Sequence, residues 1–156
     1  MRRAASVATK GQWPPEGEVG TVTLPYLDRH RRRIRLVTDS GAAFLLDLAR
    51  ARHLADGDGL LLDSGGYVRV RSAREPVLEI ETADRAILLR IAWHLGNRHL
   101  PLQVAGERLR IREDHVIAEM VSGLGGRITR LEAPFDPEIG AYAIGGAHHH
   151  DHDDTA

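Results

Sequence analysis

The first half of the chain alternates apolar and polar residues with the period of two that a β-strand requires. A first alternating stretch covers residues 19–24, and two longer stretches follow at 28–48 and 55–73. Each longer stretch contains a turn rich in Gly and Asp, TDSG in one and DSGG in the other. Alternation on both sides of such a turn is typical of a β-hairpin. We therefore predict a small all-β domain over residues 19–73, after a polar, flexible N-terminal arm over residues 1–18.

The second half changes to a helical period after Arg74. Apolar residues recur three and four positions apart in two segments, which predicts two amphipathic helices. The expected first helix is capped by Thr82 and ends at Gly96. Asp114 is expected to cap the second helix, and Gly125 to end it.

Predicted strands flank these helices. PVLEIET precedes the first helix, LPLQVAGERLRI lies between the two as strand, turn and strand, and RITRLEAPF follows the second. The order β-α-β-β-α-β is that of a ferredoxin-like domain. The predicted fold class is therefore α+β, with the small all-β domain followed by a ferredoxin-like domain over residues 74–144. The remaining stretch, 145–156, is too polar to build a core and is predicted to be a disordered His-rich tail.

Composition narrows the classes of function. The formal net charge is −1 and aromatic residues make up 4% of the chain, which argues against a nucleic-acid-binding protein. Cysteine is absent, which excludes disulfides, thiolate metal sites and cysteine nucleophiles. No apolar run approaches the ~20 residues of a membrane span, and the N-terminus lacks the apolar segment of a secretory signal. We expect a soluble, cytoplasmic protein that contacts no membrane.

Motifs of catalysis are missing from the sequence. It contains no phosphate-binding loop, no G-x-S-x-G and no dinucleotide-binding glycine pattern. The DSGG and TDSG segments have the residue types of hairpin turns. An enzyme is therefore the weaker hypothesis, and a metal hydrolase is the least favoured of the functions considered.

Metal-binding residue types gather in the tail. Its four histidines are interleaved with aspartates; they are His148, His149, His150 and His152. Neutral imidazole binds nickel, zinc, copper and cobalt, and a short His-rich tract is a compositional signal of metal binding. A purification tag is the plain alternative, but a tag is normally an uninterrupted histidine run. We favour metal binding.

Two further histidines flank predicted helix ends. His99 follows the expected end of the first helix, and His115 opens the second beside Asp114. One histidine cannot hold a metal alone, but in a two-fold dimer a histidine near the axis becomes two ligands. The alternative is that His99 and His94 are ordinary surface or capping histidines near a helix C-terminus, where imidazolium is favoured. His94 lies on the apolar stripe of the first helix, so we expect it to be packed there.

The segment DRHRRRIR, residues 28–35, is the basic cluster of the sequence. Side chains of a strand alternate between two faces, so the arginines are divided between them. A charged edge strand that resists strand pairing explains them well, as does docking to an acidic partner. We favour these two roles over nucleic-acid contact. The candidate partner-binding residues are Arg29, Arg31, Arg32 and Arg33.

Four blocks occur in a specific order along the chain: HLGNRHLPLQV (94–104), DHVIAEMVSGLG (114–125), APFDPEIGAY (133–142) and the His-rich tail. DRHRRRIRL, LLDL and DGDGLLL extend the set into the first domain. As an ordered set, these blocks resemble the UreE family of urease accessory metallochaperones, over most of the chain from about residue 19 to the tail.

The resemblance implies a homodimer formed through the ferredoxin-like domain and an N-terminal domain that binds peptides or partners. It implies Ni(II) at the dimer interface, held by His99 of each subunit. The nickel is then delivered to the urease apoprotein together with a GTPase and other accessory proteins. His115 matches a secondary metal-binding position of some members, and the tail histidines resemble auxiliary ligands. Glu113 stands where some members have a histidine, so a second interior site is not expected.

Coordination chemistry agrees with a delivery role. Two protein imidazoles leave most of nickel's coordination positions open for ligand exchange, and the short tail favours one or two ions per dimer. Zn(II) and Cu(II) should compete in vitro, because the affinity order does not favour nickel over copper. The alternative reading is a protein-interaction adaptor of the urease maturation complex, whose metal site mainly stabilises the dimer.

Overall fold

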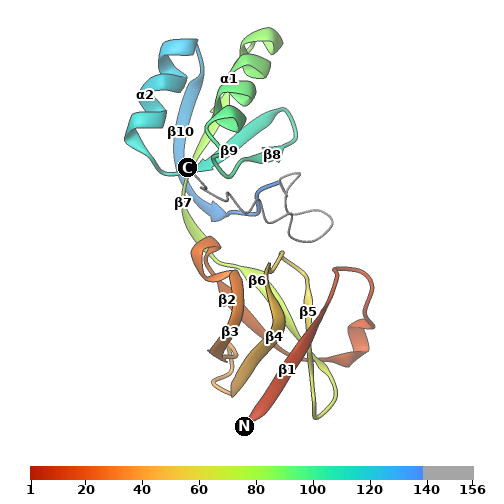
Figure 1. Cartoon of the computed structure of the whole chain (residues 1–156). Helices are drawn as coiled ribbons and strands as arrows, with labels where there is room; N and C mark the ends of the chain where they lie inside the picture. The colour runs from red at the N-terminus through yellow and green to blue at the C-terminus, as the bar shows by residue number, and fades with distance from the viewer. Residues whose placement is uncertain (139–156) are drawn as a thin grey trace, which may run out of the picture.

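The computed structural model describes residues 1–138, and the predicted disordered tail lies outside the described residues. Two β-sheets form two distinct parts of the molecule, a six-stranded sheet at one end and a four-stranded sheet covered by two helices at the other (Figure 1). Strand β7 (Arg74–Glu81) carries the chain from the first part into the second. The fold is α+β, as the sequence predicted. No helix among the described residues is long and apolar enough to cross a membrane.

The N-terminal sheet has the spatial strand order β2-β6-β5-β1-β4-β3. The pairs β1–β4 and β2–β6 are parallel, and the other neighbours are antiparallel. Its strands are β1 (Arg2–Ala8), β2 (Glu18–Leu24), β3 (His30–Val37), β4 (Ala43–His53), β5 (Gly59–Leu62) and β6 (Tyr67–Ser72). Two short 3₁₀ turns, η1 (Pro15–Gly17) and η2 (Tyr26–Asp28), precede β2 and β3.

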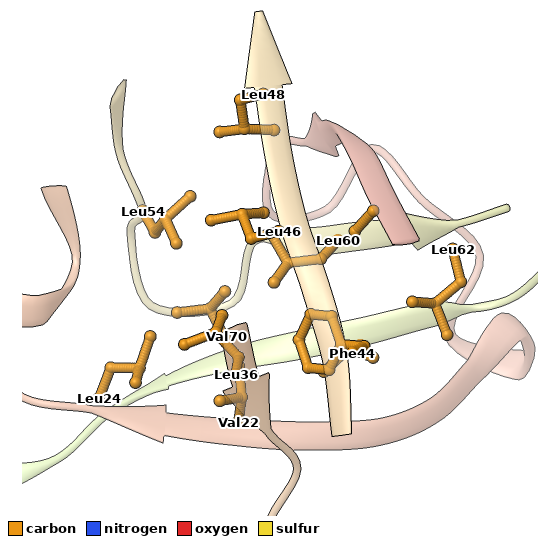
Figure 2. Close-up of a cluster of buried hydrophobic side chains, with 12 residues drawn as sticks. Val22, Leu24, Leu36, Phe44, Leu46, Leu48, Leu54, Leu60, Leu62 and Val70 are labelled. Carbon is orange, nitrogen blue, oxygen red and sulfur yellow. The ribbon is translucent and has the colours of Figure 1, made fainter. Parts of the chain in front are cut away.

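The core of this sheet is made by the inward-facing residues, which alternate with outward-facing residues along each strand. In β4, Phe44, Leu46 and Leu48 are buried, while the residues between them are half-buried. Their side chains gather with those of Leu60 from β5 and Val70 from β6 in one cluster (Figure 2). Full burial of one such side chain contributes about 1.5–3 kcal/mol. The apolar residues that recur at every second position of the sequence are therefore the ones that form this core.

The predicted flexible arm is wrong for residues 2–8, which form strand β1. This strand lies between β4, to which it is parallel, and β5, to which it is antiparallel. Ala4 is fully buried in register with Leu46 on one side and Leu62 on the other. The strand is held by hydrogen bonds to two distant strands rather than by large apolar side chains, so its own sequence carried no strong strand signal.

The C-terminal part has the predicted ferredoxin-like element order. After β7 come α1 (Arg85–Asn97), β8 (Gln103–Ala105), β9 (Arg108–Arg112), α2 (His115–Leu124) and β10 (Arg127–Pro134). The four strands pair in the order β10-β7-β9-β8, and all neighbours are antiparallel. Both helices cover one face of this sheet (Figure 1). Their apolar stripes bury Ile91, Leu95, Ile117 and Val121 against the sheet.

The ends of the helices differ in part from the prediction. Asp84, not Thr82, caps α1, and its carboxylate accepts a hydrogen bond from the amide of Ala86 at 2.9 Å. The Thr82 hydroxyl instead accepts from the amide of Asp84 at 3.2 Å. The cap of α2 by Asp114 is confirmed, and so is its end at Gly125, whose φ of 102° few other residues adopt.

Candidate metal centre

His99 lies in a special backbone conformation just beyond the end of α1. The helix continues through Gly96 to Asn97, so the predicted end at Gly96 was one residue early. The chain then reverses at His99, whose φ is 57° and whose amide donates to the Gly96 carbonyl at 3.0 Å. The amide of Leu100 donates back to the Leu95 carbonyl at 3.3 Å. These bonds terminate the helix and leave the His99 side chain exposed.

This conformation is one that glycine normally supplies. His99 is the only non-glycine residue with positive φ among residues 1–138. A residue with a Cβ atom is disfavoured there by about 1–2 kcal/mol relative to a right-handed conformation. Such strain is retained where the surrounding structure holds it, and it is frequent at functional sites. A histidine at this position therefore lowers stability relative to a glycine, but it presents an imidazole that a glycine would lack.

His115 is the first residue of α2 and is also exposed. The carboxylate of Asp114 accepts from the amides of Val116 and Ile117 at 3.0 and 3.1 Å. That oxygen is engaged in capping, so Asp114 has the structural role expected of it. Glu113 is ion-paired with Arg130 at 3.0 Å.

The two histidine-bearing loops border one hollow of the surface. This hollow, of about 130 Å³, is lined by Leu100 and Pro101, which follow His99, and by Glu113 and Asp114, which precede His115. The fold therefore brings the segments that carry His99 and His115 to one end of the domain. No group of three or more His, Asp or Glu side chains that could hold a metal occurs among the described residues. The tail histidines, His148, His149, His150 and His152, lie outside them.

The outer face of α1 carries exposed apolar residues. Leu89 and Trp93 are 64% and 63% exposed, and they lie one helical turn apart. His94 is half-buried, and its ring packs edge-on against Trp93 with a centroid distance of 5.0 Å. His94 is thus only partly packed, and its printed ring contact is with the exposed Trp93.

The structure overturns the prediction for one member of the basic cluster. Arg29 is fully buried, and its guanidinium donates to the carbonyl of Phe135 and contacts the carboxylate of Asp136 at 3.3 Å. It is therefore not available to a partner. Sequence reasoning placed it with its neighbours because a run of arginines gives no sign of which one is buried.

The neighbours of Arg29 are accessible to different degrees. Arg31 is half-buried and paired with Asp28 at 2.9 Å. Arg33 is exposed and lies 3.9 Å from Asp47. Arg32 is exposed and has no ion pair among residues 1–138.

Arg29 belongs to a joint between the two parts of the molecule. The ring of Tyr26 packs edge-on against Phe135 at 5.4 Å and lies near the guanidinium groups of Arg29 and Arg112, at 5.9 and 5.8 Å. The amide of Tyr26 donates to the carboxylate of Glu75 at 2.8 Å. A buried arginine, an aromatic pair and cation–π contacts thus hold the two sheets together.

Asp136 is the acidic member of this joint. The imidazole of His53, with Nε2 4.0 Å from Asp136 Oδ1, is the largest of the influences that hold the pKa of this carboxyl below its usual value. Arg29 and the amide of Asp56 lower the same pKa further, and partial burial opposes them. Asp136 is therefore ionised in the folded protein over an extended pH range. Sequence reasoning did not predict this joint. The one sign of it in the sequence is the segment APFDPE, where an apolar Phe135 stands next to a charged Asp136.

The joint connects to the segment that follows His99. The amide of Asp136 donates to the side-chain oxygen of Gln103 at 3.1 Å, and the amide of Glu138 donates to the Leu102 carbonyl at 2.8 Å. The described chain thus ends beside residues that lie three and four positions after His99.

The two halves of the chain match the two domains of one family. The sequence profile described as UreE urease accessory protein, N-terminal domain, matches residues 2–73, and that of the C-terminal domain matches residues 75–156. The chain is 53% identical over 152 residues to urease accessory protein UreE of Rhodopseudomonas palustris (strain BisB18), covering 97% of this chain and 72% of that protein. It is 46% identical over 162 residues to the UreE of Chelativorans sp. (strain BNC1), covering 99% and 100% of the two chains. With the UreE of Rhodobacter capsulatus it shares 45% over 152 residues, covering 97% and 94%.

Proposed function

Because this chain belongs to the UreE family of urease accessory proteins, it is a nickel metallochaperone of urease maturation, and we propose that His99 from two copies carries the nickel. It is an accessory chaperone and not an enzyme. The observation that supports the proposed site is the left-handed backbone of an exposed histidine at a helix end. Strain of this kind is maintained when the side chain serves a purpose that glycine cannot.

A homodimer supplies the second ligand. Two copies related by a two-fold axis near His99 bring two imidazoles together without any further metal-binding residue. The exposed Leu89 and Trp93 on α1 give the ferredoxin-like domain an apolar face suited to such a contact. We therefore place the dimer contact on the α1 side of this domain.

The tail histidines are proposed as auxiliary ligands. Glu138 is anchored to Leu102, close in sequence to His99. His148 follows Glu138 by ten positions, and a chain of that length spans at most roughly 33–36 Å. The tail histidines can therefore reach the His99 site of their own or the other subunit; they are His148, His149, His150 and His152. His115, the neighbour of the hollow-lining Asp114, is proposed as a secondary position.

Ligand chemistry explains why the nickel is released. Two imidazoles occupy a minority of nickel's coordination positions, so water and exchangeable tail histidines fill the rest. Zn(II) and Cu(II) compete for the same ligands in vitro. Binding weakens as the pH falls through the histidine range, because a protonated imidazole is not a ligand.

Partner docking is assigned to the exposed arginines of β3. Arg32 and Arg33, with the half-buried Arg31, give the N-terminal domain a positive surface for the urease accessory GTPase and the urease apoprotein complex, in the cytoplasm. In the alternative reading, the protein is an adaptor whose main role is to bind partners through this surface. The metal then mainly stabilises the dimer. Deleting the whole domain would uncover Phe135 and the other joint residues, so point variants are the cleaner test.

The test is urease activation in cells at limiting nickel, with the parent and two variants compared at equal protein levels. His99→Ala should lower the urease activity formed, and added nickel should restore it, because the chaperone acts by supplying the metal. Arg32→Glu with Arg33→Glu should lower activation whatever the nickel supply. If His99→Ala activates urease normally at limiting nickel while the arginine variant fails, the adaptor reading replaces the chaperone site proposed here.

A further inference from the structure

A cavity of about 500 Å³ opens on the N-terminal domain beside the joint. It is lined by Lys10 and Trp13 from the loop after β1, by the end of β6, and by Pro134 at the end of β10 in the other domain. Cavities of roughly 300–1,000 Å³ at a domain boundary are preferred sites for small molecules. None of the lining residues takes part in the proposed nickel site.

The loop that carries Trp13 is held firmly in place. The Trp13 indole donates to the Gly57 carbonyl at 3.1 Å and stacks on Tyr67 with a centroid distance of 5.1 Å. A Cβ atom on Gly59 would lie 2.7 Å from the indole, and one on Gly57 would lie 2.7 Å from the Lys10 side chain. Both glycines therefore make room for the loop. A cavity that is ordered before binding costs a ligand little conformational entropy.

Two cationic side chains of the cavity have no acidic partner. Lys10 and Arg71 form no ion pair among the described residues, whereas the neighbouring Arg69 is paired with Glu18 at 2.7 Å. Residues 1–73 as a whole contain twelve Lys and Arg against eight Asp and Glu, a formal charge of +4. Unpaired cations in a concave site on a positive domain attract an anionic ligand.

Asp39 is the acid whose carboxylate is influenced by Arg71, but it is already engaged. A hydrogen bond from the Thr21 hydroxyl, at 2.6 Å, is the largest of the influences that lower the pKa of Asp39. The Thr23 hydroxyl donates to the same oxygen at 2.8 Å, and the charge of Arg71 adds a smaller effect. The guanidinium of Arg71 therefore remains open to a ligand.

A third polar group that lines the cavity lacks a partner. Ser72 is 8% exposed, and its amide donates to the carboxylate of Asp56 at 2.8 Å. Its buried hydroxyl has no hydrogen-bond partner in the described part of the chain. Because buried hydroxyls are nearly always hydrogen-bonded, this one indicates an acceptor that the protein itself does not supply. An anionic oxygen of a ligand is such an acceptor.

The charge and the apolar part of the lining together favour a phosphate ester with a planar ring. A phosphate monoester carries a charge of about −1.5 to −2 at neutral pH, which two free cations match. Arg binds phosphate as a planar fork and Lys binds it as a point charge. The apolar lining comes from Trp13, Pro15, Val70 and Pro134. An indole among such residues suits a flat ring, which can stack on it.

We propose that this cavity binds a small phosphate monoester that carries a planar ring, of the size of a mononucleotide. The phosphate lies between Lys10 and Arg71 and accepts from the Ser72 hydroxyl, while the ring lies against Trp13. This site goes beyond the proposed function and shares no residue with the nickel ligands. Either can therefore fail while the other stands.

Lys10 is the only lysine in the sequence, which makes its occupancy easy to measure. The probe is adenosine monophosphate, mixed with the metal-free full chain before brief labelling by an amine-reactive reagent, and the labelled sites are identified by mass spectrometry. Saturating probe should slow labelling of Lys10 about fivefold or more, because an ammonium paired with a phosphate is held in its charged, unreactive form. The exposed amine of Met1 should label at its usual rate and is the internal control.

Smaller probes show which part of the ligand is recognised. Adenosine keeps the ring without the phosphate and should not protect Lys10. Inorganic phosphate keeps the charge without the ring and should protect Lys10 only at much higher concentration. Trp13 emission, followed in a Trp93→Phe background, should be quenched by adenosine monophosphate, whose ring reaches the indole, and should change little with ribose 5-phosphate.

Variants identify the contacts on the protein. Arg71→Ala should weaken binding of adenosine monophosphate about tenfold, because a charge-assisted bond is lost, and Ser72→Ala should weaken it a few-fold. Arg50→Ala removes an exposed arginine outside the cavity and should change little. The proposal is overturned if adenosine monophosphate does not protect Lys10, if adenosine or inorganic phosphate protects it equally well, or if Arg50→Ala weakens binding as much as Arg71→Ala.

Discussion

At the scale of the residue, the backbone of His99 is the most informative feature. A left-handed histidine ends α1 where glycine would be expected, and its imidazole is exposed. The next residue, Leu100, lines a hollow that Asp114, the neighbour of His115, also lines. If His99 carries the nickel as proposed, stability and metal binding make opposite demands on this one position. Glycine separates the two, because it adopts the left-handed backbone without strain but carries no imidazole to bind the metal.

His99→Gly should raise the free energy of unfolding by about 1 kcal/mol relative to His99→Ala, because glycine adopts positive φ without a Cβ clash. Both variants should lose the tight nickel site. Urea denaturation of the metal-free proteins, followed by nickel titration, measures both properties. A His99→Gly protein less stable than His99→Ala would show that the backbone at this position is not strained.

Arg29→Ala should destabilise the metal-free protein by about 2–4 kcal/mol, because it leaves the Phe135 carbonyl and the Asp136 carboxylate without their buried partner. Arg32→Ala, three positions along and exposed, is the matched control and should change stability by less than about 0.5 kcal/mol. Equal effects of the two substitutions in urea denaturation would contradict the assignment of Arg29 to the joint.

At the scale of the element, burial determines how much the sequence reveals. The strands of the N-terminal core and both helices follow from apolar spacing, since Phe44, Leu46 and Ile91 must each face a core. Strand β1 could not be predicted in this way, because RRAASVA buries one small residue and owes its conformation to distant strands. The joint was hidden for the same reason, since Arg29 meets Phe135 across 106 positions of sequence.

Substitutions of Asp114 at the start of α2 can show whether this residue caps the helix or binds metal. Asp114→Ala should lower the free energy of unfolding by about 1 kcal/mol, because two helix amides lose their acceptor. Asp114→Ser should recover most of that loss, since Ser is also a good N-cap. Nickel affinity should be unchanged in both. A loss of nickel binding in Asp114→Ser, in a stably folded protein, would instead make Asp114 a ligand.

At the scale of the whole molecule, the joint holds the N-terminal sheet against the ferredoxin-like domain. Its contacts run from Arg29 and His53 through Asp136 to Gln103, four positions after His99. The joint therefore lies between the docking surface proposed on β3 and the nickel site proposed at His99. The two domains should behave as one unit while Asp136 remains charged.

The pH dependence of the joint follows from the lowered pKa of Asp136. The folded protein keeps this carboxylate ionised at pH values where the unfolded chain, with an ordinary pKa of about 3.9, has taken up a proton. Its contribution to stability is therefore present above about pH 4 and is lost as the pH falls through the lower folded value. Stability measured between about pH 6 and pH 3 should fall less steeply in Asp136→Asn than in the parent. Identical slopes would show that Asp136 does not contribute.

The central claim is that nickel is carried by His99 at a dimer interface, with the tail in an auxiliary role. Calorimetric nickel titration of the full chain, of His99→Ala and of a chain ending at Gly146 tests it most directly. We predict that His99→Ala removes the tightest site, and that truncation weakens or reduces binding but leaves that site present. Normal nickel binding by His99→Ala, together with none by the truncated chain, would make the tail the only metal site and contradict the account.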